Sequence, residues 1–203
     1  AKIKSYLIAC HFGPTLLVTA VTFLLATSLW WEGPAFIIAF GIFLGQLIIG
    51  WTNDLYDFRD DLKHNRVKKP LVAGELKPAE LKRAIFIVLP IAIIVNLFGP
   101  LGFKAGLISI LGIGIGVSYN FYLKPTAFSP IPYALAFGLL PTALVISTDR
   151  TPPLWMFWAG ALLGMAAHFA NVLKDFREDK ESGIESLQSD LAAFHPDLSL
   201  QHF

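Results

Sequence analysis

Six long apolar segments, separated by short polar or turn-forming stretches, set the limits on how this chain can fold. They lie at about residues 6–29, 35–52, 81–98, 105–122, 131–146 and 154–173. A helix needs roughly 20 apolar residues to cross a bilayer, and most of the segments approach that length. Only 15% of the residues are charged, against about 25% in soluble domains. Because a helix satisfies its own backbone hydrogen bonds in lipid, the sequence predicts an all-α polytopic membrane helix bundle with six transmembrane helices.

The lysines and arginines are divided unevenly between the two sides that six alternating helices define. Of the 16, Lys104 and Arg150 fall on one side. The other fourteen fall on the side of the N-terminus, the second and fourth connections and the tail. Basic residues concentrate on the cytoplasmic side of membrane proteins. We therefore predict that the N-terminus and these connections face the cytoplasm. The charge pattern does not indicate nucleic-acid binding.

A dense acidic stretch at residues 53–61 follows the second apolar segment directly. At the helical period of about 100° per residue, Asp54, Asp57 and Asp61 fall within about 60° of one another, while Asp60 points away. Three carboxylates on one helix face at the end of an apolar segment are unfavourable unless a cation lies among them. Hard divalent cations are natural candidates because they take oxygen ligands.

A second cluster of similar pattern follows the last apolar segment, on the same predicted side. Its members Asn171, Asp175 and Asp179 are spaced by four residues and share one helix face. Solvated helix ends would explain one such cluster more easily than two. Facing carboxylate groups could instead hold Mg²⁺ ions that bridge a diphosphate, because Mg²⁺ commonly combines a few carboxylates with substrate phosphates.

This arrangement suits the departure of a diphosphate group. Mg²⁺ neutralises the charge that develops on the leaving diphosphate, and lysine or arginine side chains donate to its oxygens. If the group that leaves is allylic, an electron-rich acceptor captures the carbocation, and aromatic faces such as that of Tyr119 stabilise it. The apolar interior suits an isoprenoid tail. The basic loop at residues 63–69 would also anchor the chain to anionic lipid. His11 and His168 are interpreted as polar packing residues.

At these residues the chain resembles the UbiA-type intramembrane prenyltransferase superfamily, over about residues 10–187. The family's first pattern, Asn-Asp-x-x-Asp-x-x-x-Asp, is matched by Asn53, Asp54, Asp57 and Asp61, and its second, Asp-x-x-x-Asp, by Asp175 and Asp179. The segment ending in Lys69 and Pro70 and the loop holding Tyr119 and Lys124 are also similar to family segments.

The resemblance implies an all-helical membrane fold, dependence on Mg²⁺, and transfer of a prenyl chain from a prenyl diphosphate to an acceptor. It implies that five aspartates are catalytic and bind the Mg²⁺–diphosphate, namely Asp54, Asp57, Asp61, Asp175 and Asp179. The same resemblance makes other polar residues candidates for substrate binding: Asn53, Asn171, Arg66, Lys68, Lys69, Tyr119 and Lys124.

The family usually has nine membrane helices, and this chain supplies six. We therefore expect a partial prenyltransferase domain at residues 1–187 and a divergent, loose tail at residues 188–203. Two alternatives to an active enzyme are a truncated inactive homologue and a non-catalytic membrane assembly subunit. Polar groups that missing helices would cover need a partner or a second copy of the chain. A lipid head-group phosphotransferase is disfavoured because its Asp-Gly-x-x-Ala-Arg pattern is absent from the sequence.

Overall fold

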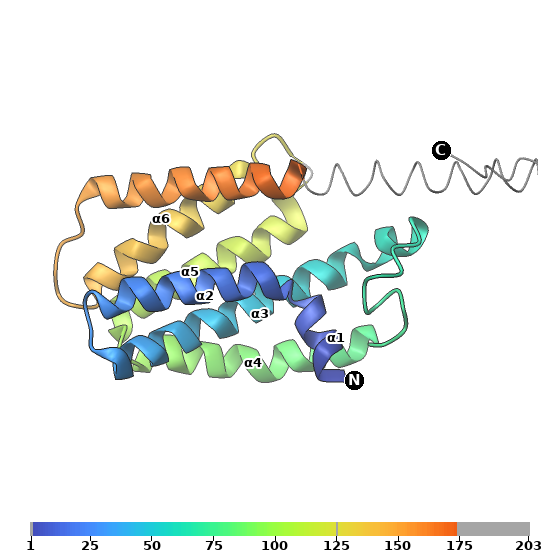
Figure 1. Ribbon diagram of the computed structural model, residues 1–203, viewed down its shortest axis with the longest axis horizontal. Coiled ribbons are helices and arrows are strands. Elements are labelled where there is room, and N and C mark those ends of the chain that lie inside the picture. Colours follow the sequence, from blue (N-terminus) through green and yellow to red (C-terminus); the bar gives the residue numbers. More distant parts are fainter. Residues whose placement is uncertain (1, 125, 174–203) are drawn as a thin grey trace, which may run out of the picture. The chain divides into compact units, whose positions relative to one another are not determined.

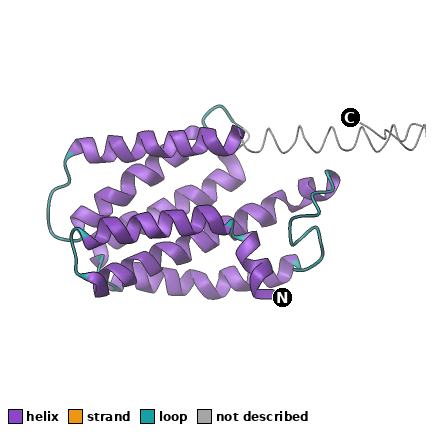
Figure 2. Ribbon diagram, viewed as in Figure 1, coloured by secondary structure: helices purple, strands orange, loops and turns teal. Residues whose placement is uncertain are grey.

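The computed structural model describes residues 2–124 and 126–173, and every regular element in those ranges is a helix (Figure 2). The chain divides into two compact units, residues 1–165 and 166–203. The elements in chain order are α1 (Lys2–Ala9), α2 (Phe12–Thr27), α3 (Glu32–Lys63), α4 (Pro78–Phe98), α5 (Gly102–Ser118), the π-helical turn η1 (Tyr119–Leu123) and α6 (Pro130–Ile146). A further helix, Leu154–Leu173, begins in the first unit. The prediction of an all-α helix bundle is confirmed.

Four of the described helices are long and apolar enough to cross a membrane: α3, α4, the run Gly102–Leu123 and Leu154–Leu173. The pair α1 and α2 would make a fifth span, but it is bent by 73°. Helix α6 is apolar and only 17 residues long. All six predicted segments are therefore helical, whereas the prediction of one unbroken first span is wrong.

Helix α3 lies at the centre of the first unit and packs against α2, α4, α5 and η1 (Figure 1). Its buried face is apolar through the membrane part and ends in Trp51. The helix then continues without a break through the whole acidic stretch to Lys63, as the sequence predicted. A single rigid element therefore carries both the core of the bundle and the first acidic motif.

The first span breaks at Cys10 and His11, and side chains donate hydrogen bonds to carbonyl groups beside the break. Thr15 Oγ1 donates to the Cys10 carbonyl at 2.8 Å, and Trp51 Nε1 donates to the Tyr6 carbonyl at 3.0 Å. Gly50 of α3 lets the Cys10 backbone approach, because a Cβ at this position would collide with the Cys10 carbonyl. Unpaired backbone groups are costly in lipid, so these contacts stabilise the break.

The end of α5 is hydrogen-bonded to α3 through the turn η1. The Lys124 N–H donates to the Tyr119 carbonyl at 3.0 Å, a bond across five residues that defines the π-helical turn. Asn120 is buried, and its Nδ2 donates to the Ile49 carbonyl at 2.8 Å and to Thr52 Oγ1 at 3.0 Å. The turn is therefore held against the part of α3 that precedes the acidic motif.

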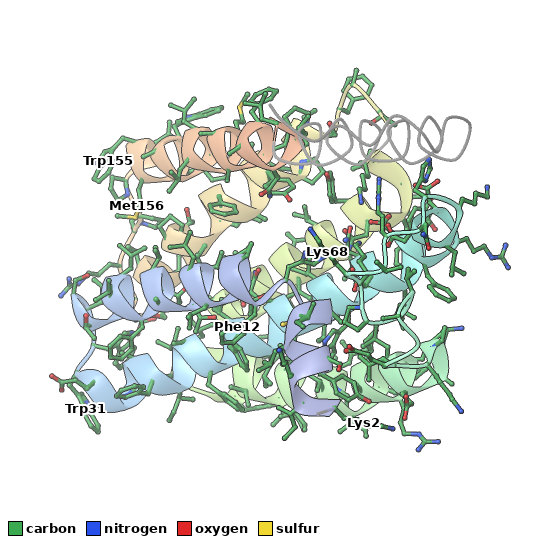
Figure 3. The ribbon with its side chains drawn as sticks, turned by 45° about the vertical axis from the view of Figure 1, so that its right-hand side comes forward. Lys2, Phe12, Trp31, Lys68, Trp155 and Met156 are labelled. Carbon is green, nitrogen blue, oxygen red and sulfur yellow. The ribbon has the colours of Figure 1, made fainter. Side chains whose placement is uncertain are left out.

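The two ends of the first unit differ in the side chains that they carry (Figure 3). Lys2 and Lys68 lie toward one end, and Trp31 and Trp155 lie toward the opposite end. Tryptophan is enriched where a helix leaves the hydrocarbon for the headgroup region. The basic and acidic loops thus gather at one end of the helices, and a tryptophan-bearing boundary marks the other.

Candidate functional site

Two of the motif's aspartates are buried and share one lysine. Asp54 is 2% exposed and Asp61 is 1% exposed. Lys69 Nζ lies 3.1 Å from Asp54 Oδ1 and 3.0 Å from Asp61 Oδ2. Burial alone would lower the pKa of the Lys69 ammonium, but the two carboxylates outweigh burial and hold that pKa above its ordinary value. The lysine therefore stays charged between them.

The loop from residue 64 to residue 77 brings the basic side chains back onto α3. Its buried Leu71 and Leu76 pack into the core that α3 and α4 share, which fixes the path of the loop. The Arg66 N–H donates to the Asp61 carbonyl at 3.0 Å, and Arg66 Nη1 lies 2.8 Å from Asp61 Oδ1. Arg66 and Lys69 thus approach the motif.

The third aspartate of the motif is paired with a different element. Lys124, directly after η1, places its Nζ 2.6 Å from Asp57 Oδ2 and 3.2 Å from Asn53 Oδ1. The Asp57 side chain is 14% exposed, more than those of Asp54 and Asp61. Asp57 is therefore the most accessible carboxylate of the three.

His11 also reaches the motif, from the break between α1 and α2. Its Nε2 lies 3.2 Å from Asn53 Nδ2 and 3.3 Å from Asp54 Oδ1. This contact was not predicted, because the first apolar segment was interpreted as one continuous helix. Thr52 and Asn120, which hold η1 against α3, were also not predicted, because neither belongs to a recognisable motif.

The remaining candidates lie elsewhere or outside the described residues. Lys68 is exposed and forms no ion pair with any carboxylate in residues 2–124 and 126–173. The Tyr119 ring packs edge-to-face on Tyr133 of α6, with 5.2 Å between centroids. Asp60 points away from the cluster as predicted, with a side chain that is 60% exposed. Asn171 is an exposed residue of the helix Leu154–Leu173, and Asp175 and Asp179 lie outside the described residues.

The first motif therefore forms a compact cluster in which carboxylates and cations alternate. Within the described ranges, no three His, Cys, Asp or Glu side chains are grouped so as to hold a metal ion, and each motif carboxylate instead faces a lysine, arginine or histidine. The donor set still fits Mg²⁺, since carboxylate oxygens suit a hard cation that shares its ligands with phosphates. The lysines and the arginine suit phosphate oxygens.

An apolar cavity of about 70 Å³ lies between α2, α3, α5 and α6. Its wall on α3 is formed by Ile38, Ile42, Gln46 and Ile49. Continued by three- and four-residue steps, this line of side chains leads to Asn53 and Asp57, so that all of them share one face of the helix. The cavity therefore lies on the face of α3 that carries Asp57, along the part of the helix that precedes the acidic cluster.

A comparison with protein families gives one match: the model of the UbiA prenyltransferase family matches residues 15–195. The chain belongs to the UbiA prenyltransferase family. This membership confirms the resemblance seen in the two aspartate motifs, both of which lie inside the matched range. UbiA membership indicates membrane prenyltransferase activity and, with the long apolar helices, a multi-pass membrane protein. No curated protein and no solved structure matches the chain significantly.

Proposed function

We propose that this UbiA protein transfers an isoprenoid chain from a prenyl diphosphate to an acceptor, with Mg²⁺ assisting the departure of the diphosphate. One observation carries the proposal. Asp54, Asp57 and Asp61 stand at the end of a membrane helix, each beside a basic side chain. Carboxylates suit Mg²⁺ and the basic side chains suit phosphate oxygens, so the cluster provides ligands for both parts of a Mg²⁺–diphosphate.

The chain's own residues have separate tasks in this proposal. Asp54, Asp57 and Asp61, with Asp175 and Asp179, would hold the metal, which neutralises charge on the leaving diphosphate when it is bound. Lys124, Lys69 and Arg66 would exchange a carboxylate for a phosphate oxygen. Lys124 is the first candidate, since it is paired with the most accessible of the three aspartates.

The reaction itself is a substitution at the first carbon of the prenyl chain. The bond from that carbon to the diphosphate oxygen breaks, and the electron pair leaves with the diphosphate. An electron pair of the acceptor forms the new bond, and the acceptor then loses a proton. The apolar face of α3 that precedes Asp57 would receive the isoprenoid tail, so that the reacting carbon would lie between the cavity and the charged cluster.

Binding of a donor analogue tests the proposal without knowledge of the acceptor. Purified protein in detergent should bind farnesyl thiodiphosphate when Mg²⁺ is present and lose that binding when the metal is chelated. Asp57→Asn should abolish binding, because it removes the accessible metal ligand. Asp60→Asn is the matched control, since Asp60 carries the same charge but points into solvent.

Two results would contradict the proposal. Binding of the analogue by the wild type without metal would remove the role of Mg²⁺. Failure of the wild type to bind the analogue in the presence of Mg²⁺ would favour the non-catalytic membrane subunit instead.

A further inference from the structure

The break in the first membrane helix places a strained residue beside the acidic motif. His11 has φ 55° and ψ 61°, the left-handed conformation that side chains of L-residues disfavour. In the described part of the chain, the other non-glycine residues with positive φ are Asn65 and Asp149, which lie in the loops after α3 and α6. Such strain persists only where the surroundings impose it, and it is common at functional sites.

Several contacts fix the backbone at this point. The Tyr6 and Cys10 carbonyls accept hydrogen bonds from Trp51 and Thr15, and Cys10 is 1% exposed. Gly50 lets the Cys10 backbone lie directly against α3. The break is therefore a built feature of the fold. Its result is that the His11 ring reaches Asn53 and Asp54 of α3, although α2 itself carries no charged residue.

The direction of the hydrogen bonds around Asn53 follows from the chemistry of its neighbours. A lysine ammonium can only donate, so the Asn53 atom that faces Lys124 at 3.2 Å is the accepting Oδ1. Nδ2 of the same amide then faces His11 Nε2 at 3.2 Å. Because an amide NH₂ can only donate, this contact is a hydrogen bond when His11 Nε2 accepts, which puts the ring proton on Nδ1.

This assignment also decides the second contact of His11. A nitrogen that accepts from Asn53 has no proton to donate to Asp54 Oδ1, which lies 3.3 Å away. The hydrogen-bonded partner of Asp54 is therefore Lys69. The only side chain to which His11 Nε2 is hydrogen-bonded, within the described ranges, is that of Asn53.

We propose that His11 is a positioning residue of the diphosphate site, acting through Asn53. By accepting from Nδ2, His11 keeps Oδ1 of the amide turned toward Lys124. Asn53 Oδ1 and Asp57 then hold the Lys124 ammonium beside the acidic motif. Without the ring, Nδ2 loses its acceptor, and the contact with Lys124 alone holds the orientation of the amide. This inference rests on the proposed function and adds a residue that the aspartate motifs do not include.

The variant His11→Gly separates the side chain from the backbone. Glycine adopts the left-handed conformation without strain, so the break should survive and the thermal unfolding midpoint should stay the same or rise. The affinity for farnesyl thiodiphosphate with Mg²⁺ should fall by about two- to tenfold, the effect of one hydrogen bond. In an Asn53→Ala background, His11→Gly should cause no further loss.

If the losses of affinity in His11→Gly and Asn53→Ala multiplied in the double variant, the inference would be overturned, because His11 would then not act through Asn53. The inference would also be overturned if His11→Gly bound the analogue with the same affinity as the wild type. A wild type that binds no analogue overturns the proposed function itself, so the two failures are distinguishable.

A second measurement needs no substrate. In ¹⁵N-histidine-labelled protein, the His11 signals, assigned by their loss in His11→Gly, should show the proton on Nδ1. In Asn53→Ala the proton should shift toward Nε2, since the donor to Nε2 is gone and the accepting Asp54 Oδ1 lies 3.3 Å away. A wild-type ring that carries its proton on Nε2 would overturn the inference.

Discussion

Lys69 is the residue on which the two most buried carboxylates of the site depend. Asp54 and Asp61 both face its ammonium at about hydrogen-bond distance, and burial leaves them little water. Removing one partner of a buried ion pair leaves the other charge uncompensated, which costs about 3–5 kcal/mol. Here that charge is on Asp54, because Asp61 keeps Arg66. We expect Lys69→Met to lower the free energy of unfolding in detergent by about this amount.

Its neighbour provides the control for this first prediction. Lys68 is exposed, so Lys68→Met should change the free energy of unfolding by no more than about 0.5 kcal/mol. Equal unfolding midpoints for both variants would show that Asp54 and Asp61 do not need the Lys69 charge.

At the residue scale the sequence predicted the carboxylates better than their partners. Helical spacing correctly separated the exposed Asp60 from the three clustered aspartates, because a helix fixes the direction of each side chain. The choice of Lys69 over Lys68 depends on the path of a loop, which spacing does not determine. The role proposed for His11 depends on the break, which Thr15 stabilises locally and which Trp51 and Gly50 stabilise from a distant part of the chain.

At the scale of elements, the approach of the α1–α2 break to α3 depends on Gly50. Added bulk at this position meets the Cys10 backbone, which cannot rotate away as a flexible side chain can. We expect Gly50→Ala to destabilise the protein by about 1–3 kcal/mol through overpacking. It should also weaken donor-analogue binding, because His11 is displaced with the break.

Gly114→Ala is the matched control for this second prediction, since a Cβ built there meets no neighbouring atom within 4 Å and Gly114 does not line the cavity. Alanine in place of glycine within a helix should leave stability equal or slightly higher. A Gly50→Ala protein with wild-type unfolding and binding would contradict the proposed dependence. Thermal unfolding and analogue binding, measured on the same preparations, distinguish these outcomes.

Helix type was predictable from apolar length, but apolar length does not show where a helix is interrupted. Apolar length predicted the helical segments, and the run of aspartates after the second segment fitted an extension of α3. The break at Cys10 is followed by Pro14, which has no N–H to donate to the Cys10 carbonyl four residues before it, but the apolar length of the segment hides this local sign. The π-helical turn Tyr119–Leu123 likewise has no pattern of its own, and Asn120 holds it through contacts with α3.

For the whole molecule, the testable property is its orientation in the membrane. The uneven distribution of basic residues predicts that the acidic site faces the cytoplasm. A cysteine introduced at Lys68 should react with a membrane-impermeant maleimide only from the cytoplasmic side. One introduced at Arg150 should react only from the opposite side. Native Cys10 is buried and adds little background. Labelling of both positions from the same side, or from reversed sides, would contradict the orientation.

The length of α3 has a consequence for where the chemistry takes place. Its 32 residues make a rod of about 48 Å, while the hydrocarbon of a bilayer is only about 30 Å thick. Roughly the last third of the rod, with the motif on it, must therefore stand at or beyond the headgroups. A diphosphate could dock there while still hydrated, and the hydrocarbon chain attached to it would remain in oil. The two products would then part by solubility alone, the diphosphate into water and the prenylated molecule into the bilayer.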